Sequence, residues 1–184
     1  MKVFISGGCK NGKSSYAERI ARNMGRDTLY YIATMRPVDE EDDMRIARHQ
    51  NERAGAGFIT IEQAEDITAI LEKCDTNAGF LLDSTTALLA NEMFLENGQV
   101  VHRAHETVIT GLSQVLENVA HIVMVSDYIF SDAEIYDPLT EAYRKSLAAV
   151  DRALAEASDV VIEVTFAGLV FHKGEALFRA GGLL

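Results

Sequence analysis

The feature that most constrains this chain is a glycine-rich segment near its start, which reads Gly-Gly-Cys-Lys-Asn-Gly-Lys-Ser over residues 7–14. It satisfies the pattern G-x-x-x-x-G-K-[ST], in which backbone N–H groups surround phosphate oxygens. Residues 1–6 ahead of it are largely apolar, as in a buried strand, and residues 15–24 behind it carry apolar side chains at helical spacing. The alternative is a glycine-rich turn that only caps a helix. Strand, loop and helix in this order favour a nucleotide-binding P-loop.

The residue types in this segment suit a nucleotide with several phosphates. Lys13 can neutralise the β and γ phosphate oxygens, Ser14 can hold Mg²⁺, and the following helix adds the positive end of its dipole. The predicted nucleotide contacts of the loop are Gly7, Gly8, Cys9, Lys10, Asn11, Gly12, Lys13 and Ser14. We expect Cys9 to face phosphate with its backbone and not with its thiol.

The charge balance of the chain disfavours one large class of partner. Lys and Arg number 17 and Asp and Glu 28, which gives a net charge of −11. Non-specific nucleic-acid binding depends on neutralising phosphates with Lys and Arg, so no nucleic-acid partner is expected. The phosphate site must therefore be a local concentration of positive charge.

The cysteines and the hydropathy pattern indicate a cellular location. The only cysteines are Cys9 and Cys74, and a disulfide at Cys9 would obstruct the phosphate loop, so a reducing compartment is indicated. The opening apolar run is far too short for a signal peptide, and no stretch approaches the ~20 apolar residues of a membrane span. We expect a cytoplasmic protein with no membrane span.

Apolar runs alternate with helical patterns along the chain. The predicted strands are Lys2–Ser6, Thr28–Ala33, Phe58–Ile61, Gly79–Asp83, His121–Ser126 and Val160–Val164. The predicted helices are Lys13–Met24, Glu40–Arg53, Gln63–Lys73, Thr85–Phe94, Val101–Glu117 and Pro138–Ala157. This alternation predicts an α/β fold with a mostly parallel sheet and helices on both faces. Because the chain has no internal repeat or long linker, residues 1–184 are expected to form a single domain that ends in a short helix or loose tail.

An acidic residue ends the fourth predicted strand. In P-loop proteins an acid in this place, here Asp83, binds Mg²⁺ directly or through water. The alternative is that Asp83 caps the helix that begins at Ser84, since Asp is a preferred N-cap residue. The two roles are compatible, and the P-loop favours the metal role.

The segment 39–53 has acids at its start and bases at its end, the order that the helix dipole favours. If it is helical, Arg45, His49 and Arg53 share one face. Two guanidinium groups beside an imidazole attract an anion and favour the neutral ring, which can attack phosphorus as a nucleophile. The alternative is a solvated helix with surface ion pairs, and this segment alone favours that alternative.

A possible metal site in the second half is a weaker candidate. His102, His105 and Glu106 can face one side of a helix at metal-ligand spacing. No further ligand is apparent in the sequence, so a surface helix is favoured.

Several segments of the first half share their order and spacing with a known family. They are Gly7-Gly8-x-x-x-Gly12-Lys13-Ser14-x-x-Ala17-Glu18, Tyr31-Ile32-Ala33-Thr34, Arg45-Ile46-x-x-His49-x-x-x-Arg53, Thr60-Ile61-Glu62, and Leu82-Asp83-Ser84-Thr85-Thr86 with Asn91. With them, the chain resembles the bifunctional adenosylcobinamide kinase/adenosylcobinamide-phosphate guanylyltransferases.

This resemblance implies a RecA-like P-loop NTPase fold, a single transferase domain and assembly as a homotrimer. It implies two reactions of cobalamin biosynthesis: phosphorylation of adenosylcobinamide by GTP or ATP, and transfer of GMP from GTP to the resulting phosphate. The second reaction passes through a guanylylated histidine, which matches His49, so His49 and Lys13 are the predicted catalytic residues. The further nucleotide contacts that the resemblance implies are Thr34, Met35, Arg36, Gln50, Asn51, Glu52, Arg53, Glu62 and Asp83, with Ser14 and Asp83 serving Mg²⁺.

The second half of the chain departs from the family pattern. The usual Asn-Glu-Val-Gly segment is replaced by Ser126-Asp127-Tyr128-Ile129-Phe130-Ser131-Asp132, and the usual Asn-Gln of the long helix by Asp151-Arg152. Because the loop 126–138 leaves the carboxyl end of a strand near the P-loop, we expect it to line the acceptor side of the site, as a lid or as a specificity loop. The alternative is a surface loop that has drifted.

Two other function classes stay open at this point. One is a P-loop kinase for a different small alcohol, in which His49 only binds phosphate. The other is a nucleotide-binding regulatory protein without turnover.

Overall fold

A computed structural model describes residues 1–36, 57–129, 134–166 and 168–184. The predicted helix Glu40–Arg53 lies outside these residues, and so do four of the predicted nucleotide contacts and His49. The strands are β1 (Lys2–Gly7), β2 (Leu29–Ala33), β3 (Phe58–Glu62), β4 (Gly79–Asp83), β5 (His121–Asp127), β6 (Val160–Thr165) and β7 (Gly168–Lys173). The helices are α1 (Lys13–Asn23), the 3₁₀ turn η1 (Ile67–Ala69), α3 (Ile70–Lys73), α4 (Thr85–Met93), α5 (Ala104–Asn118), α6 (Pro138–Ala157) and α7 (Glu175–Ala180).

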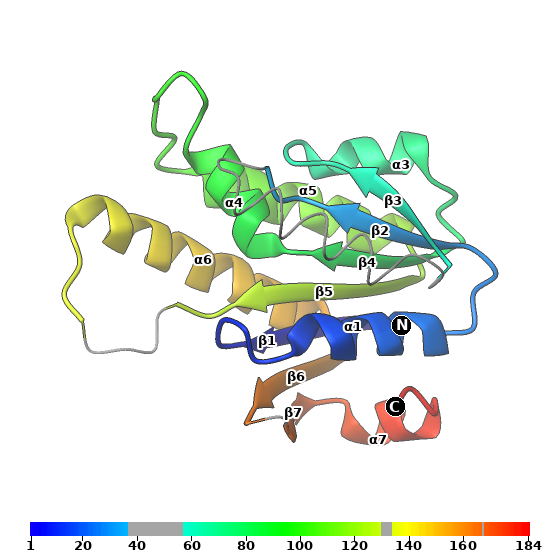
Figure 1. The fold of residues 1–184 in the computed structure, drawn as a ribbon. Coiled ribbons are helices and arrows are strands. Elements are labelled where there is room, and N and C mark those ends of the chain that lie inside the picture. Colours follow the sequence, from blue (N-terminus) through cyan, green and yellow to red (C-terminus); the bar gives the residue numbers. More distant parts are fainter. Residues whose placement is uncertain (37–56, 130–133, 167) are drawn as a thin grey trace.

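The strands form one sheet in the order β3-β2-β4-β5-β1-β6-β7. Every neighbouring pair from β3 to β6 is parallel, and β7 alone among the described strands runs antiparallel, beside β6. In Figure 1 the arrows of β2, β4 and β5 end at the same edge of the sheet, where the loop after β1 leads into α1. The mostly parallel α/β sheet predicted from the sequence is confirmed.

Helices cover both faces of the sheet, as predicted (Figure 1). Strand residues alternate between two buried clusters because successive side chains of a strand point to opposite faces. On one face Phe4, Phe80 and Met124 belong to a cluster with residues of α4, α5 and α6. On the other face Ile5 and Leu81 belong to a cluster with residues of α1 and α7. The central strands are thus buried on both sides, which explains their nearly continuous apolar sequences.

The six predicted strands are all present, with ends that differ from the prediction by one residue at most. Strand β7 was not predicted, because it is mostly exposed and pairs with β6 across an irregularity in register. The end of the chain, expected as a short helix or a loose tail, contains the short helix α7, whose Phe178 is buried against the sheet.

The predicted helix Gln63–Lys73 is wrong in its first half. Residues 63–66 form a turn in which the Gln63 amide donates to the carbonyl oxygen of Asp66 at 3.1 Å. The backbone N–H of Asp66 donates to Glu92 Oε1 at 2.8 Å, and Asp66 has a positive φ of 44°. These side-chain contacts compete with helical hydrogen bonds, so helical structure starts only at η1. The helix predicted at Val101–Glu117 likewise begins later, at Ala104.

The long helix α6 confirms its predicted ends. Asp137 is its N-cap residue and accepts hydrogen bonds from the N–H groups of Leu139 and Thr140 at 2.9 and 3.1 Å, with Pro138 in the first turn. These bonds lower the pKa of the Asp137 carboxyl, the largest effect being that of the Thr140 hydroxyl. None of the helices in the described ranges is long and apolar enough to cross a bilayer.

Candidate active site

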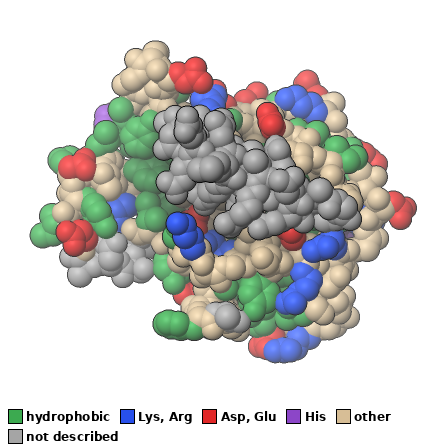
Figure 2. Space-filling model, in the orientation of Figure 1, with side chains coloured by type: hydrophobic (Ala, Val, Ile, Leu, Met, Phe, Trp, Pro, Cys, Tyr) green, Lys and Arg blue, Asp and Glu red, His purple; other side chains and the backbone are tan. Residues whose placement is uncertain are grey.

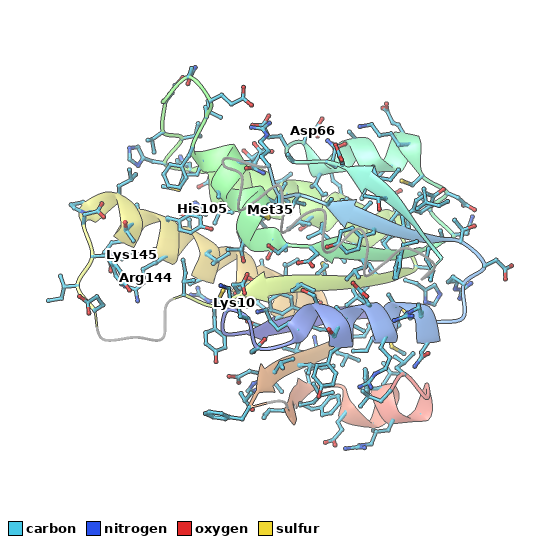
Figure 3. All side chains as sticks on the ribbon, in the orientation of Figure 1. Lys10, Met35, Asp66, His105, Arg144 and Lys145 are labelled. Carbon is cyan, nitrogen blue, oxygen red and sulfur yellow. The ribbon has the colours of Figure 1, made fainter. Side chains whose placement is uncertain are left out.

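The carboxyl ends of the central strands bring the predicted site residues to one edge of the sheet. The register pairs Gly7 of β1 with Asp127 of β5, Asp83 of β4 with Val125 of β5, and Ala33 of β2 with Asp83. Ligands of open parallel sheets bind outside this edge. Figure 3 shows Lys10 and Met35 at the same edge, although they come from different loops.

The P-loop folds tightly against the sheet. Asn11 donates from its amide to the carbonyl oxygen of Val164 at 2.6 Å, and its Oδ1 accepts from the N–H of Lys13 at 3.2 Å. A Cβ added to Gly7 would lie 2.8 Å from the same carbonyl oxygen, so only glycine fits there without a shift. Gly12 has a φ of 89° and precedes the first residue of α1. The two glycines therefore have distinct roles, close approach for Gly7 and a left-handed turn for Gly12.

Lys13 is buried, with 5% of its surface exposed. Its Nζ donates to the carbonyl oxygen of Gly8 at 2.7 Å and to Asp127 Oδ1 at 2.6 Å. A buried ammonium group needs such partners, since an unpaired one is very costly. In this structure the lysine predicted to bind phosphate is held by a carbonyl group and a carboxylate at the mouth of the loop.

Asp83 stands where a metal-binding acid is expected, at the carboxyl end of β4. Its Oδ2 accepts a hydrogen bond from the hydroxyl of Tyr31 at 2.9 Å. The N-cap residue of α4 is Ser84, whose hydroxyl accepts from the N–H of Ala87 at 3.3 Å. The capping alternative for Asp83 is therefore wrong, because the helix starts one residue later than that role requires.

The residues after β2 are fastened to the end of β4. The hydroxyl of Thr34 donates to the carbonyl oxygen of Ser84 at 2.7 Å and accepts from its N–H at 2.8 Å. Asn91 of α4 donates to the carbonyl oxygens of Thr34 and Ala64 at 2.7 and 2.9 Å. Asn91, part of the family resemblance, thus ties two loops to the edge of the sheet.

Two other predicted nucleotide contacts, Arg36 and Glu62, belong to the described residues near this edge. Arg36 pairs with Glu65 at 3.0 Å and with Glu96 at 3.4 Å. Glu62 ends β3 and stands opposite Ala33 of β2 in register. The predicted residues Gln50, Asn51, Glu52, Arg53 and His49 lie outside the described residues, so their placement beside the P-loop stays a prediction.

A buried polar network below the P-loop was missed by the sequence analysis. The N–H of Asp127 donates to Thr86 Oγ1 at 2.8 Å, and the Thr86 and Ser126 hydroxyl oxygens are 3.5 Å apart. Ser126 donates to Asp151 Oδ1 at 2.7 Å, and Tyr143 donates to the carbonyl oxygen of Thr86 at 2.9 Å. The network links the long helix α6 to the strand end that faces Lys13.

Asp151 is the buried end of this network. Burial is the main cause that raises its pKa to about 7, with a smaller effect from the charge of Asp127, while the hydrogen bond from Ser126 acts in the opposite direction. Its second oxygen, Oδ2, is buried without a hydrogen-bond partner. A signal for this was present in the sequence, since Asp151 falls on the apolar stripe of α6 with Leu147 and Leu154.

The weaker metal candidate finds no support in the structure. The ring of His105 lies 3.4 Å from the hydroxyl of Ser146, and Glu106 pairs with Arg103 at 2.5 Å. Within the described part of the chain, no group of three or more His, Cys, Asp or Glu side chains is arranged to hold a metal ion.

The fold and the P-loop together define the class of protein. A parallel sheet with a P-loop after β1 and an acid at the end of β4 is an α/β P-loop NTPase fold. A solved ATPase from a bacterial type III secretion system has the same general fold, with a TM-score of 0.50 and 14% identity, over 98% of this chain and 61% of that one.

Sequence comparison identifies the family within this class. The family model described as cobinamide kinase / cobinamide phosphate guanyltransferase matches residues 3–172. The chain belongs to this family.

Two curated relatives match nearly the whole chain. A bifunctional adenosylcobalamin biosynthesis protein CobP of Pseudomonas aeruginosa is 31% identical over 180 residues, which cover 96% of this chain and all of that protein. A bifunctional adenosylcobalamin biosynthesis protein CobU of Salmonella typhimurium is 27% identical over 172 residues, 88% of this chain and 93% of that protein. The match therefore extends into the second half, where the sequence departs from the family motifs.

Proposed function

We propose that this chain is a bifunctional enzyme of cobalamin biosynthesis. It phosphorylates the hydroxyl of adenosylcobinamide with GTP or ATP and then transfers GMP from GTP to adenosylcobinamide phosphate. The observation that carries the proposal is the P-loop, with Lys13 at its mouth, inside a family match over residues 3–172. The rival functions, a kinase for another alcohol and a regulatory nucleotide-binding protein, account for the P-loop but not for the family match.

Triphosphate binding requires Lys13 to change partners. In the present arrangement its Nζ contacts Gly8 and Asp127, and phosphate oxygens carry more charge than either partner. The N-terminus of α1 follows the loop directly and adds the positive end of its dipole. The loop therefore has the charge and the backbone donors that the β and γ phosphates need.

The residues near the loop fit Mg²⁺ as a cofactor. Mg²⁺ prefers oxygen ligands and uses one or two protein groups together with substrate phosphates and water. Ser14 provides a hydroxyl in the first turn of α1, and Asp83 provides a carboxylate whose Oδ2 is oriented by Tyr31. When bound, the ion neutralises charge on the phosphates. Ser14 and Asp83 are therefore the proposed metal ligands.

GMP transfer is proposed to use His49 as the nucleophile. The imidazole nitrogen attacks the α phosphorus of GTP, the bond from that phosphorus to the bridging oxygen breaks, and pyrophosphate leaves with the electron pair. A phosphate oxygen of adenosylcobinamide phosphate then attacks the same phosphorus, and the phosphorus–nitrogen bond breaks to restore the histidine. Arg45 and Arg53, four residues away on either side, would offset the charge that develops.

The acceptor is proposed to bind beside α6. Figure 2 shows hydrophobic side chains gathered over the N-terminal part of α6 and the segment after α4. Exposed apolar residues there include Phe94, Ile135, Tyr136 and Leu139. An exposed apolar patch of this kind suits the large, partly apolar body of a corrinoid.

Arg144 holds the two described ends of the loop that borders this patch. Its Nε donates to the carbonyl oxygen of Ile129 at 2.9 Å, and its guanidinium lies 4.7 Å from the ring centre of Tyr136. Figure 3 shows Arg144 and Lys145 on α6. Ile129 and Tyr136, held in this way, can contribute to the shape of the acceptor site.

Two further properties are proposed: assembly as a homotrimer, which the family resemblance implies, and a cytoplasmic location, which the cysteines and the hydropathy pattern indicate. Both Cys9 and Cys74 are free thiols, which agrees with a reducing compartment. The trimer is testable by light scattering of the purified protein.

Product analysis tests the proposed function. The protein is incubated with adenosylcobinamide, GTP or ATP, and Mg²⁺, and the corrinoid products are separated and weighed by mass spectrometry. We expect a first product that has gained one phosphate and, with GTP, a second that has also gained GMP. Nucleotide hydrolysis with no modified corrinoid would favour a kinase for another alcohol, and binding without turnover would favour the regulatory protein.

A further inference from the structure

Asp127 occupies a rigid position at the mouth of the P-loop. It ends β5 opposite Gly7 in register, and the N–H of the next residue, Tyr128, donates to the carbonyl oxygen of Gly7 at 3.2 Å. Its own N–H donates to Thr86 at 2.8 Å. The backbone of Asp127 is therefore held on both sides, and its side chain, 27% exposed, opens toward solvent at the site edge.

The hydrogen bonds below Asp127 have a defined direction. Ser126 donates its only hydroxyl proton to Asp151, so its oxygen is left to accept. Thr86 accepts from the N–H of Asp127 and has its own hydroxyl proton to donate toward Ser126, 3.5 Å away. The chain thus runs from Asp127 through Thr86 and Ser126 to Asp151, and it fixes the strand end that carries the Asp127 carboxylate.

Nucleotide binding changes the surroundings of this carboxylate. Lys13 Nζ lies 2.6 Å from Asp127 Oδ1 in the present arrangement, and it turns to the β and γ phosphates when a triphosphate is bound. Asp127 then loses its cation while it stays next to the phosphate that is to be transferred. A carboxylate in this place repels the phosphate and so weakens triphosphate binding. This cost is offset if the carboxylate acts on another reactant.

We propose that Asp127 is the catalytic base of the phosphoryl transfer. This inference rests on the proposed kinase function. The proton of the acceptor hydroxyl passes to the Asp127 carboxylate as the hydroxyl oxygen forms its bond to the γ phosphorus. The bond from that phosphorus to the β–γ bridging oxygen breaks, and the nucleoside diphosphate leaves with the electron pair. Asp127 then returns the proton to solvent.

A change at Asp127 should affect phosphoryl transfer, but not triphosphate binding or GMP transfer to the protein. Asp127→Asn keeps the size of the side chain and an oxygen for Lys13, but removes the basic carboxylate. It should slow phosphoryl transfer. It should not weaken triphosphate binding, because the internal competitor for Lys13 is weakened. It should also leave GMP transfer from GTP to the protein intact, because that step needs no acceptor hydroxyl.

The test compares Asp127→Asn, Asp127→Glu and the exposed control Glu117→Gln with the wild type. Phosphate transfer from ATP to adenosylcobinamide, the affinity for GTP, and covalent labelling by GTP with a labelled α phosphate are measured. We expect Asp127→Asn to lower kcat of phosphate transfer by about 100-fold or more, with GTP affinity equal or tighter and labelling unchanged. Asp127→Glu, which keeps a carboxylate, should retain more activity than Asp127→Asn, and Glu117→Gln should match the wild type.

Three results would overturn the inference. The first is a kcat of Asp127→Asn within about threefold of the wild-type value. The second is full rescue of this variant by excess Mg²⁺, which would make Asp127 a metal ligand. The third is an Asp127→Glu variant that is no more active than Asp127→Asn. A failure of Asp127→Asn to bind GTP would also contradict the inference, because the loss would then lie in triphosphate binding and not in proton transfer. A wild-type protein that modifies no corrinoid contradicts the proposed function, and this inference with it.

Discussion

Lys13, the first residue of α1, faces Asp127, the last residue of β5, with 2.6 Å between Nζ and Oδ1. The Lys13 cation is thereby paired with a negative charge of the protein itself. Binding of a triphosphate exchanges this internal partner for phosphate oxygens. The contacts of Asn11 already shape the backbone of the loop, and the exchange of one side-chain partner is the change that binding requires.

The first prediction concerns Lys13. Lys13→Ala should lower the affinity for GTP by at least about 100-fold and abolish transfer, because Lys13 is the buried cation of the loop, whereas Lys10 is exposed. The fold should persist with a stability change of about 1 kcal/mol, since the Asp127 carboxylate left behind is partly hydrated. Calorimetry with GTP and urea unfolding measure the two effects. Undiminished GTP affinity would contradict the P-loop assignment.

The second prediction uses two neighbouring glycines as a matched pair. Gly7→Ala should destabilise the protein by about 2 kcal/mol, because the added Cβ would lie 2.8 Å from the carbonyl oxygen of Val164. Gly8→Ala should leave stability nearly unchanged, because a Cβ there meets no atom within 4 Å. Urea unfolding of both variants is the measurement. Equal effects at the two positions would show that Gly7 is not constrained by the sheet.

The third prediction concerns the pH dependence of stability. The pKa of Asp151 is about 7 in the folded protein and 3.8 ordinarily, so the folded state binds one more proton than the unfolded state between these pH values. The contribution of Asp151 to the free energy of unfolding is fully present below about pH 4 and is lost as the pH rises to about 7. Ser126, Asp127 and Tyr143 are the groups that face it.

Asp151→Asn removes this titration. The variant should be more stable than the wild type at pH 8, by an amount on the order of a few kcal/mol, and its stability should change less between pH 4 and 7. Asp27→Asn, at an exposed position, is the control and should keep the wild-type pH dependence. Urea unfolding across this pH range gives the comparison. If the stabilities of the wild type, Asp151→Asn and Asp27→Asn all rise by the same amount between pH 4 and 7, the assignment is contradicted.

The fourth prediction concerns the loop that Arg144 holds. Replacing Tyr128, Ile129 and Phe130 with alanine should raise KM for the corrinoid acceptor severalfold and leave GTP affinity nearly unchanged. The hydrogen bond from Arg144 to Ile129 is made to the backbone oxygen, so this contact does not depend on the side chains that are replaced. Steady-state kinetics with each substrate separates the two effects. An unchanged acceptor KM, or a loss confined to GTP, would exclude a role of this loop in the acceptor site.

Local patterns in the sequence were sufficient for the parallel sheet and the P-loop. The central strands were recognisable because they are buried on both faces and therefore continuously apolar, and the P-loop because its glycines and Lys13 have fixed spacing. The exposed strand β7 carries no such pattern. The start of the helix predicted at Gln63 was wrong because the contact between Asp66 and Glu92 joins residues far apart in the sequence.

In the candidate site, too, local patterns were predictable and contacts between distant residues were not. Lys13 and Asp83 were identified from their motif and strand position, and the structure brings them to one edge of the sheet. The pairing of Lys13 with Asp127, and the chain from Thr86 to Asp151, depend on which strands are neighbours. Strand order is a tertiary property that the local sequence does not specify.

The most direct test of the account is covalent labelling by GTP that carries its label on the α phosphate. The wild-type protein should acquire a label that is acid-labile and alkali-stable, as expected of a phosphorus–nitrogen bond, and should lose it on addition of adenosylcobinamide phosphate. His49→Ala should acquire none and keep part of its kinase activity, because phosphoryl transfer depends mainly on positioning and charge. Labelling of His49→Ala to the wild-type level would contradict the assignment of His49, and absence of label from the wild type would contradict the proposed guanylyl transfer itself.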